Sequence, residues 1–211
     1  MDSEHRRPYL VGLTGSIGMG KTETAKLFAQ LGIPVFDSDA TVRALYAPGG
    51  AGVAPVGAVF PGTVCDGQVD RTALAAELER DPSAFARLEA IVHPLVRQAR
   101  SAFVRRAAER GDELVIVDIP LLFETGSQHE VDAVVVVSAP RQVQEQRVLA
   151  RPGMTPEKLE LLGARQMPDA EKRAKADFVI ETHKGLAQAF LDVKRVAAEL
   201  RARAKQGASD A

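Results

Sequence analysis

The stretch Leu10–Phe28 reads LVGLTGSIGMGKTETAKLF, and it decides the fold. An apolar run passes into a glycine-rich segment, then a single lysine, and then a pattern typical of a helix. Within it, Gly15–Thr22 (GSIGMGKT) fits G-x-x-x-x-G-K-[ST] in full, a motif that requires a strand before it and a helix after it. The sequence therefore predicts a loop that cradles phosphates, placed between a buried strand and a helix.

The residue types of this loop suit phosphate binding. Glycines reach backbone conformations closed to residues with a Cβ atom, so successive N–H groups can point inward at phosphate oxygens. The following helix adds the dipole of its N-terminus, Lys21 can reach the β- and γ-phosphates, and the Thr22 hydroxyl can ligate Mg²⁺. The alternative is a flexible turn that matches by chance, and the agreement of motif with context argues against it. We therefore expect a nucleoside triphosphate to bind here.

Five short apolar runs predict buried strands. They are rich in Val, Ile and Leu without alternation, which is typical of strands covered on both faces. Helical patterns lie between them, the first over about 20–31 and the last over about 185–203. This alternation predicts an α/β fold with a parallel, doubly wound sheet. The five runs are Tyr9–Leu13, Pro34–Asp37, Leu114–Asp118, Ala133–Ser138 and Asp177–Glu181.

Residues 41–112 interrupt this alternation. We expect no strand in them, but a Gly/Pro-rich loop followed by helical segments over Arg71–Arg80, Ser83–Ile91 and Pro94–Arg110. The stretch is too long for one crossover helix, so we interpret it as an inserted helical lobe. The whole chain is then a single domain with a core at about 9–40, 113–140 and 176–205.

Residues 141–175 form a second, helical and polar interruption. They carry eight cations and five anions, a net charge of +3 in a chain whose total is −1. A pair of solvated helices would explain this pattern, and so would a mobile lid that closes over phosphates. We expect the lid, because its cations would face the phosphates of a bound nucleotide.

Three aspartates lie at or just beyond the ends of expected strands, where the carboxyl ends of a doubly wound sheet face the ligand crevice. Asp37 and Asp39 close the second run, and one of them can orient an acceptor hydroxyl while the other positions metal or loop. Alternatively they cap a helix that begins near Thr41. Asp118 closes the run LVIVD and suits the water shell of Mg²⁺, with a cap of the next turn as the alternative.

Composition excludes several classes of protein. The net charge of −1 provides no overall basic field for nucleic acid, and the absence of asparagine excludes the Asn-Lys-x-Asp signature of guanine-reading GTPases. The one cysteine, Cys65 in an expected loop, allows no internal disulfide. The N-terminus lacks the apolar core of a signal peptide, and no apolar run is long enough to span a membrane. We expect a cytoplasmic protein, and a monomer rather than an oligomer.

Several motifs in combination resemble those of the dephospho-CoA kinase family. The resemblance is collinear over about 9–200, and it rests on the combination because many kinases share the phosphate loop. It implies a P-loop kinase sheet with a CoA-binding lobe and a lid. It also implies transfer of the ATP γ-phosphoryl group to the ribose 3′-hydroxyl of dephospho-CoA, the last step of coenzyme A synthesis. The motifs are GLTGSIGMGKT, VFDSDATVRAL, LEAIVHPLVR, VIVDIPLLFE, RVLARPGMTPEK and RQMPDAEKRAKADFVIE.

The resemblance implies roles for matching residues. Lys21, Asp39 and Arg147 are the expected catalytic residues, with Asp39 orienting the acceptor hydroxyl as a base. Thr22 and Asp118 are the expected Mg²⁺ ligands. Contacts with ATP are expected from Gly15, Ser16, Gly18, Met19, Gly20, Lys21, Thr22, Glu23 and Arg151, and acceptor contacts from Asp39, Arg43, His93 and Asp118. For His93, which precedes a proline, shaping a helix junction is the alternative.

Four positions depart from the family's usual residues. Ser16 stands in place of a second glycine and Met19 in place of serine or alanine, while Glu89 and Thr182 each stand in place of asparagine. A serine still offers its backbone N–H, so the change in the loop is mild. The departures bear on the adenine and acceptor contacts rather than on the reaction.

Two other functions remain open. Another small-molecule P-loop kinase would hold its acceptor in the same inserted lobe, and an ATP-binding regulatory module would bind nucleotide without turnover. The joint presence of Lys21, Thr22, Asp39 and the lid arginines argues against an inactive site. Release of ADP with different acceptors separates the three possibilities.

Overall fold

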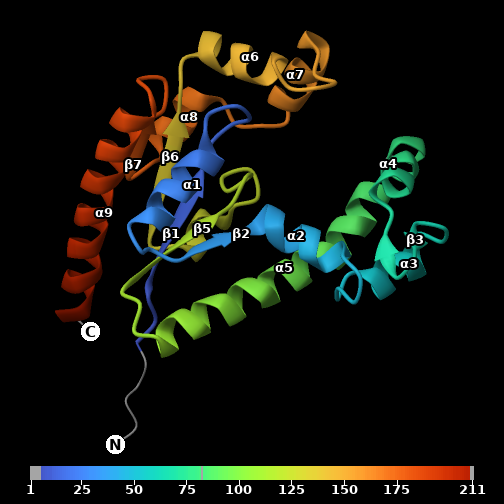
Figure 1. Cartoon of the computed structure of the whole chain (residues 1–211), viewed down its shortest axis with the longest axis horizontal. Helices are drawn as coiled ribbons and strands as arrows, with labels where there is room; N and C mark the ends of the chain where they lie inside the picture. The colour runs from blue at the N-terminus through green and yellow to red at the C-terminus, as the bar shows by residue number, and fades with distance from the viewer. Residues whose placement is uncertain (1–5, 82, 210–211) are drawn as a thin grey trace, which may run out of the picture. The chain divides into compact units, whose positions relative to one another are not determined.

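The computed structural model describes residues 6–81 and 83–209, and it confirms the α/β fold. Five strands form one sheet in the order β2–β5–β1–β6–β7 (Figure 1), and the pairs β1–β5, β1–β6 and β6–β7 are parallel. Every strand lies within one residue of its expected bounds. The strands are β1 (Tyr9–Thr14), β2 (Val35–Asp37), β5 (Leu114–Asp118), β6 (Ala133–Ser138) and β7 (Phe178–Glu181).

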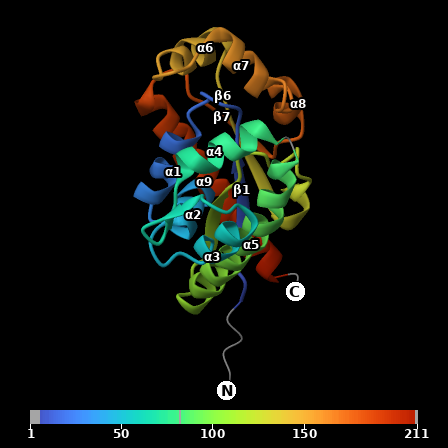
Figure 2. The same cartoon turned by 90° about the vertical axis from the view of Figure 1, so that its right-hand side faces the viewer.

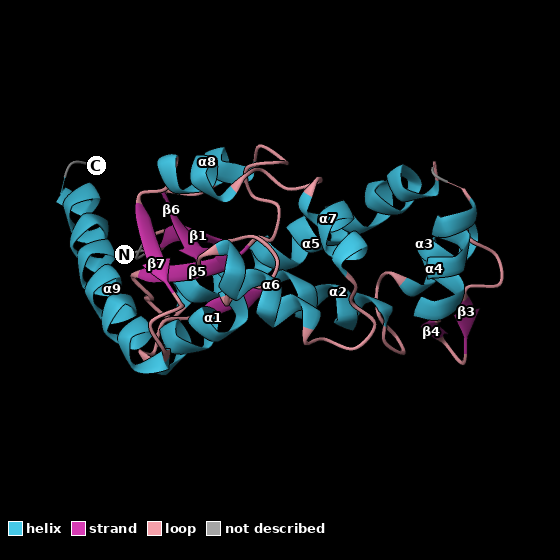
Figure 3. Ribbon diagram, turned by 90° about the horizontal axis from the view of Figure 1, so that it is seen from above, coloured by secondary structure: helices cyan, strands magenta, loops and turns pink. Residues whose placement is uncertain are grey.

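Helices cover both faces of this sheet, as the continuous apolar runs predict. Helices α1 (Lys21–Gln30) and α9 (Leu186–Ser209) pack against each other, while α8 (Asp169–Ala174) packs on β6. Figures 2 and 3 show α8 on the opposite side of the sheet from α1. The alternation of side chains along β6 explains the two layers. Val135 joins the core beneath α1 and α9, whereas Val134 and Val136 pack with Leu122 on the other face.

Residues 37–105 form one compact unit, and the rest of the chain forms the other. The smaller unit has its own core, built on Val56, Phe60, Val69 and Leu74. Its elements are α2 (Ser38–Tyr46), α3 (Val53–Val59), β3 (Val64–Cys65), β4 (Gln68–Val69), α4 (Arg71–Arg80) and the first part of α5 (Ala84–Glu109).

Two expectations for this smaller unit were wrong. The Gly/Pro-rich stretch contains α3, and the stretch expected to lack strands contains the antiparallel hairpin β3–β4, with Cys65 exposed in β3. The turn of this hairpin is Asp66-Gly67, and both residues have positive φ angles, 49° and 72°. Asp-Gly is a strong signal for such two-residue turns, so this hairpin could be read from the sequence.

The helix boundaries differ from expectation at Pro94 and at the end of α9. Two helical segments were expected to meet at Pro94, but α5 runs through it without a break. A proline removes one helical hydrogen bond, and packing of Leu88 and Ile91 against the smaller unit's core holds the helix before it. Helix α9 continues to Ser209 rather than ending near Arg203, and its inner face buries Val193 and Leu200.

The segment expected to be a lid is helical in three pieces. Helices α6 (Arg141–Leu149) and α7 (Pro156–Gly163) come before α8, and residues 164–168 connect α7 to α8. We call residues 164–168 the α7–α8 linker. A single 3-10 turn, η1 (Ser127–Glu130), lies between β5 and β6. Among the described residues, no helix combines the length and the hydropathy needed to cross a bilayer.

Candidate active site

The phosphate loop, residues 15–22, connects β1 to α1 as its motif requires. Gly18 and Gly20 have φ angles of 78° and 93°, in the left-handed region that favours glycine. Space is also limiting, because a Cβ atom on Gly18 would lie 2.5 Å from Cγ2 of Val148. A Cβ atom on Gly15 would lie 2.6 Å from the carbonyl oxygen of Val137. The loop therefore needs these glycines for its own shape.

Two residues that depart from the family pattern, Met19 and Thr182, form hydrogen bonds that fix the loop. Met19 is buried, and its Sδ accepts a hydrogen bond from the Ala139 N–H at 3.1 Å. The Thr182 hydroxyl donates to the carbonyl oxygen of Met19 at 2.7 Å. The two departures are therefore neighbours, and they tie the loop to the ends of β6 and β7.

Lys21 and Asp118 form an ion pair beside the loop. Lys21 is the first residue of α1, and Asp118 is the last residue of β5, paired in register with Leu13 of β1. Their side chains are only 14% and 8% exposed, so the charges are largely removed from water. The structure thus brings together two of the residues expected in the site.

The residues near the loop fit a magnesium ion that is held mainly by phosphate and water. Thr22 is exposed in the first turn of α1, next to Lys21, and Asp118 supplies one carboxylate nearby. Within the described part of the chain, no group of three or more His, Cys, Asp or Glu residues is arranged to hold a metal. Mg²⁺ commonly uses one or two protein ligands together with substrate phosphates, so this sparse donor set suits it.

Arg147 makes hydrogen bonds to the phosphate loop and to Thr182, just after β7. Its guanidinium donates to the hydroxyl and to the carbonyl oxygen of Thr182, each at 2.8 Å, and to the carbonyl oxygen of Gly18 at 3.4 Å. Glu23, in contrast, is exposed and pairs with Lys26 at 2.7 Å. Arg151 is exposed just after the end of α6. The two expected lid arginines therefore occupy different environments.

Two glutamines that no sequence motif indicated hold the tip of the loop. The Ile17 N–H donates to Oε1 of Gln166 at 3.1 Å, and Nε2 of Gln144 donates to the Ile17 carbonyl oxygen at 2.8 Å. Gln144 lies in α6 and Gln166 in the α7–α8 linker. A glutamine in a polar helical segment carries no signal of such a role, because only the tertiary fold brings it to the loop.

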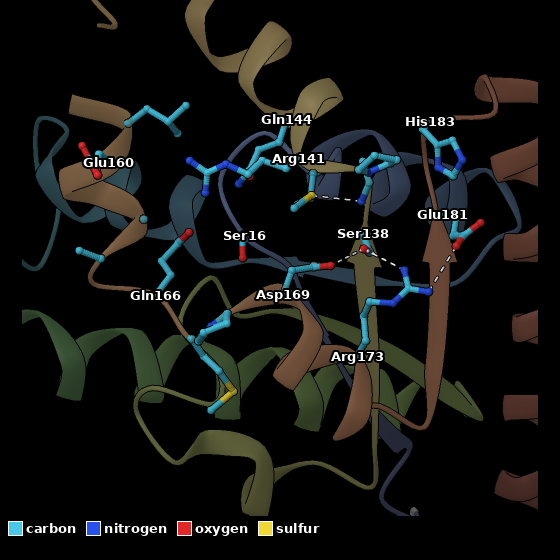
Figure 4. Close-up of a pocket in the computed structure, with 18 residues that line it drawn as sticks. Ser16, Ser138, Arg141, Gln144, Glu160, Gln166, Asp169, Arg173, Glu181 and His183 are labelled. Atoms are coloured by element: carbon cyan, nitrogen blue, oxygen red, sulfur yellow. Dashed lines mark hydrogen bonds and ion pairs between the residues drawn. The ribbon is translucent and has the colours of Figure 1, made fainter. Parts of the chain in front are cut away.

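A pocket of about 650 Å³ adjoins the loop at Ser16 (Figure 4). On its wall, the Ser138 hydroxyl donates to Asp169 at 2.7 Å and accepts from Arg173 at 3.0 Å. Glu181 also lines it, and hydrogen bonds from Lys184 and then from Arg173 hold the pKa of Glu181 below its ordinary value. Its wall also includes Met19, Leu159, Gln166, Met167 and His183.

The other expected site residues lie in the smaller unit. Asp37 ends β2, and its side chain accepts the Ala40 N–H at 2.7 Å, so the capping interpretation is correct for this residue. Helix α2 begins at Ser38 rather than near Thr41, so Asp39 is an exposed residue of its first turn and does not end the strand. Arg43, also in α2, lies 3.9 Å from Asp37, and His93 is exposed on α5.

Comparisons with known proteins find one family of similar sequences. The family model described as dephospho-CoA kinase matches residues 9–188. Dephospho-CoA kinase of Mesorhizobium japonicum is 55% identical over 192 residues, which is 91% of this chain and 96% of that protein. The enzyme of the same name from Rhodopseudomonas palustris strain CGA009 is 52% identical over 89% of this chain and 93% of its own length.

Two solved structures share the fold of this chain. The Thermus thermophilus protein TT1252 superposes with a TM-score of 0.79 at 36% identity, covering 92% of this chain and 99% of its own. Dephospho-CoA kinase from Campylobacter jejuni, at 20% identity and a TM-score of 0.66 over 92% of this chain and 97% of its own, shares the fold. With a complete phosphate loop and a family model that matches residues 9–188, this chain belongs to the dephospho-CoA kinase family.

Proposed function

We propose that this protein transfers the γ-phosphoryl group of ATP to the ribose 3′-hydroxyl of dephospho-CoA, giving coenzyme A and ADP. The observation that carries the proposal is the phosphate loop with Lys21 held beside Asp118, in a chain that matches the family over residues 9–188. Phosphoryl transfer needs positioning and charge stabilisation more than covalent chemistry, and this site offers both.

The loop and its lysine would bind the phosphates of ATP. Backbone N–H groups around Gly18 and Gly20 would donate hydrogen bonds to phosphate oxygens, and the Lys21 ammonium would contact the transferring group while keeping one donor on Asp118. Thr22 and Asp118 would hold Mg²⁺, which supplies charge neutralisation on the phosphates when bound. Each of these residues acts by orienting the nucleotide and by stabilising charge.

The two arginines would act at different places. Arg147 already donates to Thr182 and Gly18, which favours a role in shaping the nucleotide site. Arg151, exposed beyond the end of α6, is the better candidate for contacting the transferring phosphoryl group. This assignment exchanges the roles expected from the sequence, because an arginine with three protein acceptors has less freedom to follow developing charge.

The smaller unit would hold the acceptor. Asp39 is proposed to accept the hydrogen bond of the 3′-hydroxyl and to take its proton late in the reaction. Arg43 and His93, both exposed in that unit, are proposed contacts for the acceptor. Residues 37–105 would then form the CoA-binding lobe, and residues 141–175 the lid. We also propose that the protein works in the cytoplasm as a monomer without nucleic acid.

An acceptor screen tests the reaction. The protein is incubated with Mg-ATP and, separately, dephospho-CoA, shikimate, gluconate or nucleoside monophosphates, and ADP is measured together with the mass of the product. Among these acceptors, we expect only dephospho-CoA to give ADP, together with coenzyme A. ADP release with a different acceptor would identify another small-molecule kinase, and the absence of ADP with every acceptor would identify an ATP-binding module without turnover.

A further inference from the structure

Two glutamine side chains hold the tip of the phosphate loop by hydrogen bonds to the N–H and the carbonyl oxygen of Ile17. Gln166 accepts the N–H of Ile17, and Gln144 donates to the carbonyl oxygen of the same residue. Ile17 is half-buried, and it lies in the loop between Gly15 and Gly18. Since glycines leave this backbone flexible, contacts from outside the loop decide which conformation it holds.

Glu124 holds the linker at Met167, the residue after Gln166. The Met167 N–H donates to Oε1 of Glu124 at 2.8 Å. The same oxygen lies 2.8 Å from Nζ of Lys172 in α8. Gln166 and Met167 therefore tie the linker to two separate partners, the phosphate loop and the segment that follows β5.

The ion pair between Glu124 and Lys172 is largely shielded from water. Lys172 is 0% exposed and Glu124 15%. Burial alone would raise the pKa of Glu124, but the adjacent Lys172 ammonium and the hydrogen bond from the Met167 N–H outweigh it and hold the pKa below its ordinary value. Buried ion pairs often stabilise a fold no better than apolar residues of the same size, so this pair calls for a role beyond stability.

We propose that Glu124 is a positioning residue, which holds the linker at Met167 and so places Gln166 to fix the phosphate loop at Ile17. The linker would thereby couple α8, which carries Lys172, to the nucleotide site. Since coupling between two sites is reciprocal, a nucleotide that orders the loop would also order the linker. The inference rests on the proposed binding of ATP at this loop.

The first test separates the hydrogen bond from the charges. The double variant Glu124→Gln with Lys172→Met loses both charges but keeps an acceptor for the Met167 N–H. The matched variant Glu124→Leu with Lys172→Met loses the charges and the acceptor. Kd for Mg-ATP is measured by calorimetry without acceptor, well below the melting temperature of each variant. We expect the first Kd to stay near the wild-type value and the second to rise about five- to one-hundredfold. Equal Kd values would overturn the proposal.

The second test addresses Gln166 directly and does not depend on how the double variants fold. Gln166→Leu removes the acceptor of the Ile17 N–H, and Gln146→Leu makes the same change at an exposed position of α6. We expect Kd for Mg-ATP to rise about five- to one-hundredfold in Gln166→Leu and to stay unchanged in Gln146→Leu. A Kd for Gln166→Leu equal to that of Gln146→Leu contradicts the proposal.

A third measurement asks whether Glu124 acts through Gln166. Gln166→Leu is added to the variant Glu124→Leu with Lys172→Met. If both changes break one chain of contacts, Kd should rise little beyond the larger single effect, whereas fully additive effects would refute the chain. These readouts need no acceptor. Failure of the wild-type protein to bind Mg-ATP, or to make coenzyme A, would instead count against the proposed function.

Discussion

Lys21, the first residue of α1, forms an ion pair with Asp118 at the carboxyl end of β5, and the pair is largely shielded from water. An ammonium group has three donors, so Lys21 can keep one on Asp118 while offering the others to phosphate. Asp118 thus holds the lysine side chain in place before a nucleotide arrives. This preorganisation matters because charge that is already oriented needs no rearrangement during the reaction.

We predict that Lys21→Ala nearly abolishes turnover. Loss of a single oriented contact to developing charge commonly lowers kcat by about 10²–10³. Lys26→Ala is the control, because Lys26 lies on the same helix, is exposed and pairs only with Glu23 in the contacts described. ADP release measures activity, and circular dichroism checks folding. More than about a tenth of wild-type activity in folded Lys21→Ala would contradict the phosphate-loop interpretation.

We predict that Asp39→Asn lowers kcat by about 10²–10⁴ and leaves Kd for ATP nearly unchanged, because it removes the base but retains the size of the side chain. Asp37→Asn should have a smaller effect. Asn caps a helix as well as Asp does, so it should preserve the bond to the Ala40 N–H.

The comparison of these two variants locates the base. An inactive Asp37→Asn beside an active Asp39→Asn would show that the other carboxylate orients the acceptor. Full activity in both would mean that this Asp-Ser-Asp stretch serves only to begin α2.

The two arginines should separate kinetically. Arg151→Ala is expected to lower kcat more than it raises KM for ATP, as for an interaction that strengthens in the transition state. Arg147→Ala should chiefly raise KM, because its guanidinium holds Thr182 and Gly18 around the nucleotide site. Steady-state kinetics over a range of ATP concentrations measures both values, and the reverse pattern would restore Arg147 as the residue that contacts the transferring group.

The buried pair of Glu124 and Lys172 predicts a stability that depends on pH. The folded state holds the pKa of Glu124 below its ordinary value of 4.5, so the unfolded state takes up the proton first as pH falls. The pair's contribution is therefore full above that ordinary pKa and is lost as pH falls through the lowered pKa of the folded state.

Urea unfolding of the wild-type protein and of Glu124→Gln, from about pH 7 downward, tests this expectation. The difference in unfolding free energy between the two proteins should shrink as Glu124 becomes protonated. A difference that stays constant across this range would show that the charge of Glu124 does not contribute in the folded state.

The parts of the fold that local chemistry determines could be read from the sequence. Glycine spacing before Lys21 predicted the phosphate loop, and continuous apolar runs predicted all five strands of the sheet to within one residue. Asp66-Gly67 also carries a local signal for the hairpin β3–β4, although no strand was expected there. Each of these signals lies within a few neighbouring residues, so no tertiary information was needed.

The contacts that complete the candidate site had no such local signal. Met19 and Thr182 each looked like an isolated departure, and only the folded chain shows that one donates to the other. Gln166 and Ile17 are separated by 149 residues, so neither a periodic pattern nor a local motif could predict that they pair. The sequence by itself determined the strand–loop–helix that can bind phosphate. The tertiary structure decided which side chains hold that loop in one shape, because those bonds form between segments that only folding brings together.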